Sequence, residues 1–568
     1  MKRSFFVFIL VFSFSGVFGR TVKNVIFIVP DGTSLETLSL TRMFLQYTDS
    51  SKTGLTLDPY FCGFVRNHST NAPVGDSAPT MGWYMTGYPS QTGFVAMSPP
   101  QDVNDLVYVN PLWAYSPRMT IAEGARIAKN KAVGIVVTCE VYQATPANLF
   151  AHWHKRSNYR IILQQMVHSS IDVVIGGGTG LLTKEQETFL REKGVHVCRD
   201  DLQSFRNSRS GKLWALFGDK YMSNEWDRDT TAQPSLAEMT RKAISLLSEN
   251  DEGFLLLVEG SKIDWMSHRN DPVGIISEVS ALDEAFAVAI EFARNDGQTL
   301  VVVCPDHGTG GVSIGNSLSD KGYDRLPIDS IMGPLARCTR TSEYITEQLI
   351  ALPKYSVSAV IYQYWAILPD SIEIDSVFSG VEAYNRSGGN QTVKDELTNV
   401  IAGVLKSRTY IGFTTHGHTG EDVFLAVYDP RADMRVTGYL TARDINWYMC
   451  DAVGIGSLDE LTDRYYCKAT DLFGGEGFQL KSSDETLTIG FGADTLFVHA
   501  YTNQVLKNGQ VFETQTPAVY VDTTNTWFVS RECLEILSSN YSRHSRAGGN
   551  PLHLVIPAQA GIPLLLIN

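Results

Sequence analysis

The sequence is poor in cysteine and short of positive charge. Eight cysteines occur in 568 residues, and no two of them form a C-x-x-C pair, which excludes the common zinc-ribbon and thioredoxin-like motifs. Lys and Arg number 47 against 61 Asp and Glu, so the formal net charge is −14. Proteins that bind nucleic acid need a basic surface, so we expect no nucleic-acid partner. A small anionic substrate stays compatible with this charge if metal ions supply local positive charge.

Long apolar runs are also scarce. The N-terminal stretch of residues 5–18 is mostly apolar, follows Lys2 and Arg3, and precedes the small Gly19. This pattern predicts a secretory signal peptide over residues 1–19, and an uncleaved membrane anchor is the alternative. No later segment has the length and apolarity of a transmembrane helix. We therefore expect an exported protein, periplasmic or extracellular, with no stable transmembrane segment after cleavage.

Export would permit disulfide bonds. Cys139 and Cys304 lie in apolar, strand-like runs and are expected to be buried free thiols. Cys450 and Cys467 flank a short polar segment. They are the pair that we predict to be bonded.

Five apolar, β-branched runs end abruptly in polar or glycine residues. They cover residues 25–29, 133–137, 173–175, 254–258 and 300–303, with helix-compatible segments at 121–130, 235–249 and 276–294. Runs without alternation indicate strands buried on both faces, as in a parallel sheet covered by helices. We expect a three-layer α/β/α sandwich around a largely parallel central sheet. Ligands of such folds gather at the carboxyl ends of the strands.

Two regions interrupt this alternation. Residues 329–410 are helical and irregular, which predicts a cap or subunit-contact insertion before the sheet resumes near residues 410–415. After Asp471, short apolar runs at 487–489, 496–499 and 519–521 and an Asn-Gly turn predict a small β-rich domain. The expected division is a catalytic domain over 20–475, a β-rich domain over 476–541, and a poorly ordered, proline-broken tail over 542–568.

The segment from Glu259 to His268 has the highest density of metal-ligating residue types. Glu259 ends the run at 254–258, and Asp264 and His268 follow at a spacing of four residues. On a helical turn this spacing places both side chains on one side, as two ligands of one zinc ion must be. Glu259 would then serve a different ion. A capped helix with a surface histidine is the alternative interpretation.

Five further segments carry residues suited to phosphate or metal chemistry. Taken singly, three of them have ordinary alternatives: an Asp-Gly turn, an N-cap serine, and a surface threonine or arginine. Together they comprise Asp31 after the first strand, Ser77 before a helix-compatible segment, Thr145 and Arg156 after the second strand, Asp306-His307 after the last strand, and His418 in the loop 416–422. A helix N-terminus favours a phosphate, threonine oxygen suits magnesium, and an arginine fork matches two phosphate oxygens.

In this order and spacing, the residues over about 22–455 resemble the alkaline phosphatase family of bacterial, exported, metal-dependent phosphomonoesterases. The resemblance implies an α/β sandwich, two zinc ions and one magnesium ion per chain, hydrolysis of phosphate monoesters, and a homodimer. It implies roles for individual residues as follows: Asp264, His268 and His418 for the first zinc; Asp31, Asp306 and His307 for the second; Glu259, Thr145 and Asp31 for magnesium; Ser77 as nucleophile; and Arg156 as phosphate clamp.

Three positions depart from the family pattern. Pro79 directly follows Asp76-Ser77-Ala78, Gln143 replaces an acidic or imidazole residue, and Trp265 replaces a lysine or histidine beside Asp264. We expect them to alter metal affinity, phosphate release and pH optimum without changing the reaction class. A phosphodiesterase or sulfatase of the same superfamily, or an inactive surface-binding homologue, are the alternatives. The resemblance disfavours them because Glu259, Thr145 and Arg156 are all present, and the serine segment lacks the sulfatase arginine.

Overall fold

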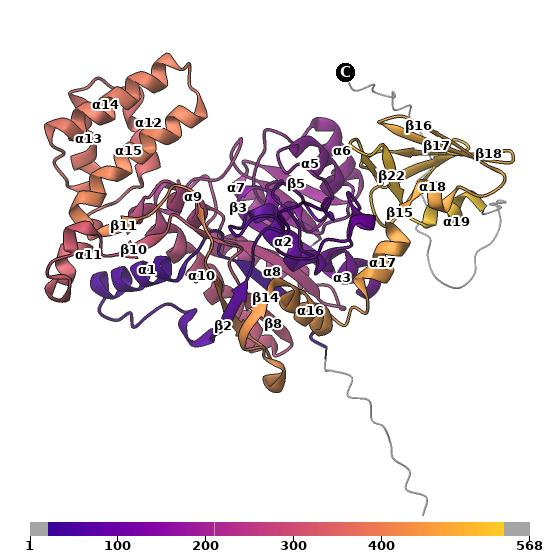
Figure 1. The fold of residues 1–568 in the computed structure, drawn as a ribbon, viewed down its shortest axis with the longest axis horizontal. Coiled ribbons are helices and arrows are strands. Elements are labelled where there is room, and N and C mark those ends of the chain that lie inside the picture. The colour runs from indigo at the N-terminus through magenta and orange to yellow at the C-terminus, as the bar shows by residue number, and fades with distance from the viewer. Residues whose placement is uncertain (1–20, 210, 539–568) are drawn as a thin grey trace, which may run out of the picture.

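A ten-stranded sheet forms the centre of the computed structural model, which describes residues 21–209 and 211–538 (Figure 1). In spatial order its strands are β14 (Gly438–Thr441), β2 (Phe61–Arg66), β13 (Val423–Tyr428), β8 (Thr299–Val303), β1 (Asn24–Val29), β7 (Phe254–Glu259), β3 (Ala132–Glu140), β4 (Val173–Gly177), β6 (Lys212–Leu216) and β5 (Val195–Arg199). β13 runs antiparallel to both neighbours, and the other pairings are parallel. The predicted fold class is confirmed. The predicted signal peptide and the 542–568 tail lie outside the described residues.

The central strands separate two hydrophobic cores. Ile26 and Ile28 of β1 face one core, and Val25, Phe27 and Val29 face the other, because successive strand side chains point to opposite sides. The first core is covered by α1 (Leu35–Thr48), α7 (Leu202–Asn207), α8 (Leu236–Leu247) and α10 (Pro272–Asp296), and the second by α2 (Ser77–Thr86), α3 (Ile121–Lys129), α5 (Tyr159–Val167), α6 (Lys184–Glu192) and α16 (Ala442–Val453). Burial on both faces explains why these strands read as continuous apolar runs.

The region 328–409 is a set of helices that forms a lobe at one end of the molecule (Figure 1). They are α11 (Ile328–Ala336), α12 (Ser342–Leu349), α13 (Ser356–Trp365), α14 (Ser371–Arg386) and α15 (Gln391–Thr409). The expectation that the central sheet resumes near residues 410–415 is wrong. β11 (Ile411–Phe413) pairs with β10 (Val312–Ile314) in a separate two-stranded sheet, and the central sheet resumes at β13. In β11 only Ile411 and Gly412 are fully buried, so this short run does not enter the two-sided core.

The C-terminal region is rich in antiparallel strands. β16 (Phe478–Ser482), β17 (Thr486–Phe491), β18 (Asp494–His499), β19 (Gln504–Lys507) and β20 (Gln510–Glu513) form one sheet, and β15 (Cys467–Lys468), β22 (Thr526–Val529) and β21 (Val519–Val521) form another. The sheets share a core with α18 (Ala469–Leu472) and α19 (Glu532–Ser538). Asn508 and Gly509 both have positive φ, as a two-residue hairpin turn requires. β15 precedes residue 476 yet pairs with β22, so the domain boundary at 475/476 stays a prediction.

All eight cysteines are free thiols, so the predicted Cys450–Cys467 disulfide is wrong. Cys450 is buried on α16 in the second core, and its thiol lies 3.7 Å from the side-chain oxygen of Asn446. Cys467 belongs to the C-terminal sheet, where its thiol donates to the carbonyl of Asp463 at 3.0 Å. Closeness in sequence did not place the two side chains together. Among the described residues, no helix combines the length and apolarity needed to cross a membrane.

A thiol count tests this arrangement. Protein unfolded in denaturant without reductant should give eight reactive thiols per chain with Ellman's reagent, because each cysteine is unbonded. Reductant should leave the melting temperature unchanged. A count of six, or a fall in melting temperature on reduction, would show that a disulfide had formed.

Candidate functional site

The predicted site residues gather at the carboxyl edge of the parallel strands. The strands β1, β7 and β8 lie side by side in the sheet, and β3 is the next strand beyond β7. Asp31 follows β1, Glu259 ends β7, Asp306 and His307 follow β8, and Thr145 lies on α4 (Ala144–Ala147) after β3. Parallel strands bring these chain-distant residues to one edge.

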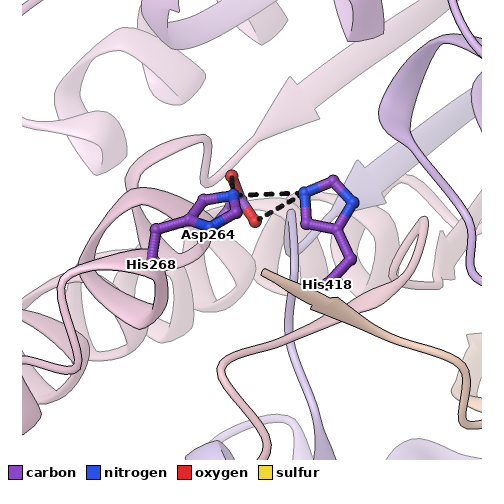
Figure 2. A group of neighbouring side chains, drawn as sticks. All are labelled: Asp264, His268 and His418. Carbon is purple, nitrogen blue, oxygen red and sulfur yellow. Dashed lines mark hydrogen bonds and ion pairs between the residues drawn. The ribbon is translucent and has the colours of Figure 1, made fainter. Parts of the chain in front are cut away.

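Asp264, His268 and His418 form one candidate metal group (Figure 2). Asp264 and His268 lie on α9 (Lys262–His268), as their spacing predicts, and His418 comes from β12 (His418–Thr419). One ligand atom from each lies within 4.8 Å of the others. The Nε2 atoms of His268 and His418 are 3.1 Å apart, and Nε2 of His268 is 3.3 Å from Oδ2 of Asp264.

Backbone carbonyls orient the rings of this group. His268 donates from Nδ1 to the carbonyl of His416 at 2.5 Å, and His418 donates from Nδ1 to the carbonyl of Gly75 at 2.8 Å. In both rings Nε2 is therefore left to face the group, which is how metal-binding histidines are usually held. Burial would lower the pKa of His268, but the Asp264 carboxylate raises it to about 9. The Asp264 carboxylate thus favours positive charge at this position.

Asp31, Asp264 and His307 form a second group, again with ligand atoms within 4.8 Å. The ligands expected for the second zinc are Asp31, Asp306 and His307, so this group contains Asp264 in place of Asp306. Asp306 is nevertheless close, since its Oδ2 is 3.3 Å from Nε2 of His307. Asp264 therefore touches both groups, which its position in the sequence did not reveal.

Ser77 faces the second group. It is the first residue of α2, is 5% exposed, and its Oγ lies 3.3 Å from Nε2 of His307. Pro79 occupies the third position of this helix, where the backbone N–H has no intrahelical partner, so the helix starts without loss. The first helical hydrogen bond runs from Thr80 N to the carbonyl of Asp76.

Glu259 and Thr145 are both buried, and Glu259 lies next to Asp31 as well as Thr145. The Glu259 carboxylate interacts with Asp31, Ser261 and Thr145, and it accepts from the thiol of Cys139 at 3.5 Å. Burial raises the pKa of Glu259 to about 7. Burial, together with the nearby carboxylates of Asp306, Asp264 and Glu259, raises the pKa of Asp31 well above its ordinary value.

Arg156 reaches the site from the loop that precedes α5. Its Nη1 donates to Oδ1 of Asp76 at 2.6 Å, next to Ser77. Asp76 is the N-cap residue of α2, but its side chain makes no capping bond and binds Arg156 instead. This ion pair, which the sequence did not indicate, holds the guanidinium beside the start of the helix.

The donor set fits divalent cations. The buried oxygens Oδ1 of Asp31 and Oδ2 of Asp306 have no hydrogen-bond partner, and both lie within 4 Å of one imidazole nitrogen, Nε2 of His307. Buried carboxylates are costly unless they are paired or bind metal. Carboxylate and imidazole groups suit zinc, and the oxygen-rich surroundings of Glu259 and Thr145 suit magnesium. The raised pKa values of Asp31 and Glu259 show the same need for positive charge.

Several contacts of the site were not predicted. Thr309 donates to Oδ1 of Asp264 at 2.6 Å, and Gln143 donates to Glu140 at 3.1 Å. The ring of Trp265 packs edge-on against Tyr221 at 4.8 Å. Apart from Gln143, whose partner is three residues away, each pairs residues more than forty positions apart, so no local pattern could have signalled it.

Gly32 has no side chain, and this lets Asp264 and Thr309 pack closely against its backbone. Its φ is +63°, and a Cβ there would lie 2.5 Å from Oδ1 of Asp264 and 2.7 Å from Oγ1 of Thr309. Gly32→Ala should therefore displace Asp264 and weaken metal binding by about tenfold or more. This is the loss of metal affinity typical when a residue that orients a metal ligand is changed. Gly297→Ala is the matched control, since φ is +67° with nothing within 4 Å. Equal zinc affinity in the two variants, measured by chelator competition, would contradict the prediction.

A largely parallel α/β sheet with carboxylates, imidazoles and a buried serine at the carboxyl edge of its parallel strands has the arrangement of a hydrolytic enzyme. A family model described as alkaline phosphatase matches residues 22–455. The chain belongs to the alkaline phosphatase family and is a phosphatase.

Individual proteins and solved structures that are similar to this chain are also alkaline phosphatases. Alkaline phosphatase 3 of Bacillus subtilis is 30% identical over 426 residues, which cover 72% of this chain and 85% of that protein. The cold-active alkaline phosphatase of the psychrophile Shewanella sp. is a similar solved structure, with a TM-score of 0.65 and 27% identity over 76% of this chain and 99% of that one. A mutant of TAB5 alkaline phosphatase, solved with Mg in its M3 site, shares the fold with a TM-score of 0.51 and 21% identity over 77% of this chain and 99% of that chain.

Proposed function

We propose that this chain hydrolyses phosphate monoesters to an alcohol and inorganic phosphate through a phosphoserine on Ser77. The observation that carries the proposal is the buried Ser77 hydroxyl, 3.3 Å from Nε2 of His307 at the N-terminus of α2. A hydroxyl there can attack a phosphorus atom while backbone donors and the helix dipole favour the phosphate oxygens. Family membership and the clustered carboxylates and imidazoles support it.

Two zinc ions and one magnesium ion are the proposed cofactors. Asp264, His268 and His418 would hold the first zinc, and Asp31, Asp306 and His307 the second. Glu259, Thr145 and Asp31 would hold magnesium, an ion bound in the TAB5 mutant structure. When bound, such ions lower the pKa of hydroxyl groups and water and neutralise phosphate oxygens. Four carboxylates at this edge would otherwise repel a phosphate dianion.

The chain's own residues then have definite tasks. Oγ of Ser77 gives up its proton and forms a bond to phosphorus as the ester bond breaks, and the leaving alkoxide takes up a proton to become the alcohol. Arg156, fixed by Asp76, offers paired N–H groups to two phosphate oxygens. A water molecule then attacks the phosphoserine from the side that the alcohol has left, which releases inorganic phosphate and restores the Ser77 hydroxyl.

A substrate panel with metal analysis tests the proposal. Purified protein should cleave a chromogenic phosphate monoester much faster than a diester or a sulfate ester with the same leaving group, and should contain about two zinc ions per chain. Faster turnover of the diester or the sulfate ester would favour the alternative activities of the superfamily. No turnover of any ester by the metal-loaded protein would favour an inactive binding homologue.

We also propose that the chain is exported, that it forms a homodimer, and that residues 20–475 and 476–541 are separate catalytic and β-rich domains. The family resemblance supports the dimer, and the apolar N-terminal stretch supports export. Light scattering should give a mass of twice 62.8 kDa, less any cleaved segment. A monomeric mass at micromolar concentration would contradict the dimer.

A further inference from the structure

Lys262 is a buried lysine that the proposed chemistry does not use. It is the first residue of α9, which carries Asp264 and His268, and it is 1% exposed. Its ammonium group donates to the carbonyl of Met222 at 2.9 Å and lies 3.7 Å from Oε2 of Glu343 on α12. The charge also lies 4.9 Å from the ring centre of Tyr221 and 5.6 Å from that of Trp265. Burying a lysine is costly, so these partners must compensate it.

The surroundings of this ammonium group are acidic and buried. Glu343 accepts from Tyr221 at 3.2 Å and from Asn224 at 2.8 Å. Burial raises the pKa of Glu278 to about 7, against the pull of Lys262, and raises that of Asp227 to about 6, with Lys262 among the groups that oppose the shift. Lys262 is thus a buried cation among the carboxyl groups of Glu343, Glu278 and Asp227.

Helices of the 328–409 lobe also bind the residues that directly follow α9. Arg269, the residue after α9, donates to Oδ1 of Asp395 on α15 at 2.6 Å. Two residues further, Oδ2 of Asp271 accepts from the backbone N–H of Ser342 at the start of α12 at 2.8 Å. The first residue of α9 is therefore tied to α12, and the residues just after α9 are tied to α15 and α12, by ionic or charge-assisted bonds.

We propose that Lys262 is a positioning residue: through Met222 and Glu343 it fixes the rotation of α9, so that the helical lobe helps to hold Asp264 and His268 in their metal-binding geometry. This rests on the proposed function in taking Asp264 and His268 as zinc ligands. The physical reason is geometric. A metal site loses affinity when its ligands must be ordered on binding, and groups that support the ligands typically contribute tenfold to a hundredfold in affinity.

The test compares Lys262→Met with Lys131→Met. Methionine keeps most of the apolar stem of lysine and removes the charge. Lys131 is a matched control because it is also buried and its ammonium group also donates to backbone carbonyls, those of Lys23 and Glu252, each at 2.7 Å. In metal-free protein, backbone amides of 262–268 should exchange with deuterium about tenfold faster in Lys262→Met than in the control. Zinc affinity, from chelator competition, should fall by about tenfold.

Further variants keep the proposal falsifiable. Glu343→Gln should lower zinc affinity less than Lys262→Met does. The double variant Lys262→Met/Glu343→Gln should recover part of the affinity lost in Lys262→Met, because the carboxylate in the ion pair with Lys262 is then removed together with the ammonium group. Saturating zinc should restore kcat in Lys262→Met. Unchanged amide exchange and zinc affinity alongside a lower melting temperature would overturn the proposal, since Lys262 would then serve stability alone. Wild-type protein that binds no zinc would instead contradict the proposed function.

Discussion

Ser77→Ala should lower turnover of a phosphate monoester by a factor on the order of 10⁴ or more, because loss of a nucleophile can cost up to about 10⁶ in kcat. The change removes one oxygen at the start of α2, and alanine suits a helix. Zinc content should stay near the wild-type value, since Ser77 is outside both candidate metal groups. Steady-state kinetics and metal analysis on the same preparation measure both quantities.

Ser169→Ala is the matched control for this variant. Ser169 is also buried, and its hydroxyl donates to the carbonyl of Gln165 at 2.7 Å. Ser169→Ala should leave turnover within about twofold of wild type, because Ser169 is not a candidate site residue and polar changes away from a functional site act mainly on stability. Turnover by Ser77→Ala equal to that of the control would remove Ser77 from its proposed role.

Removal of metal ions should abolish activity and destabilise the protein. A ligand that binds only the folded state stabilises it by about 4 kcal/mol at a thousandfold excess over its Kd. Chelation followed by dialysis should therefore lower the melting temperature by several degrees, and zinc with magnesium should restore it. Asp264→Asn is the control, since Asp264 touches both candidate groups and its loss should make the protein insensitive to chelator.

The metal-free protein should also respond to pH in a defined direction. Burial raises the folded-state pKa of Glu259 to about 7, above the unfolded value near 4.5, and that of Asp31 is raised as well. A carboxyl group with a raised folded-state pKa favours the folded state when protonated, so stability is lost as the pH rises from about 4.5 through 7. The melting temperature of the metal-free protein should therefore fall as the pH is raised from about 4.5 to 7. A rise in melting temperature there would contradict the carboxylate cluster.

The central fold could be predicted from sequence because its strands are buried on both faces. A run such as that of β1 has no polar alternation, and this pattern has few other interpretations. The run at 411–413 was misjudged because three apolar residues suit either a core strand or a two-stranded sheet, and only the pairing with β10 decides. The Cys450–Cys467 prediction failed for a similar reason, since nearness in sequence says nothing of side-chain direction.

The site was predictable where chemistry coincides with strand ends. Glu259 ends a buried strand, and Asp31 and Asp306 come shortly after two others, so the fold alone brings the three to one edge of the sheet. The Asp76–Arg156 pair and the Lys262–Glu343 pair join residues eighty or more positions apart. Neither pair has a periodic or local signal, and only the packing of separate elements reveals it.

The most direct test of the account is a search for the phosphoserine. The metal-loaded enzyme should be mixed with a phosphate monoester, quenched in acid within one turnover, digested, and examined by mass spectrometry. We predict one added phosphate on the peptide that contains Ser77, absent from Ser77→Ala. An active enzyme with no phosphorylated peptide, or with phosphate on another residue, would contradict the proposed mechanism.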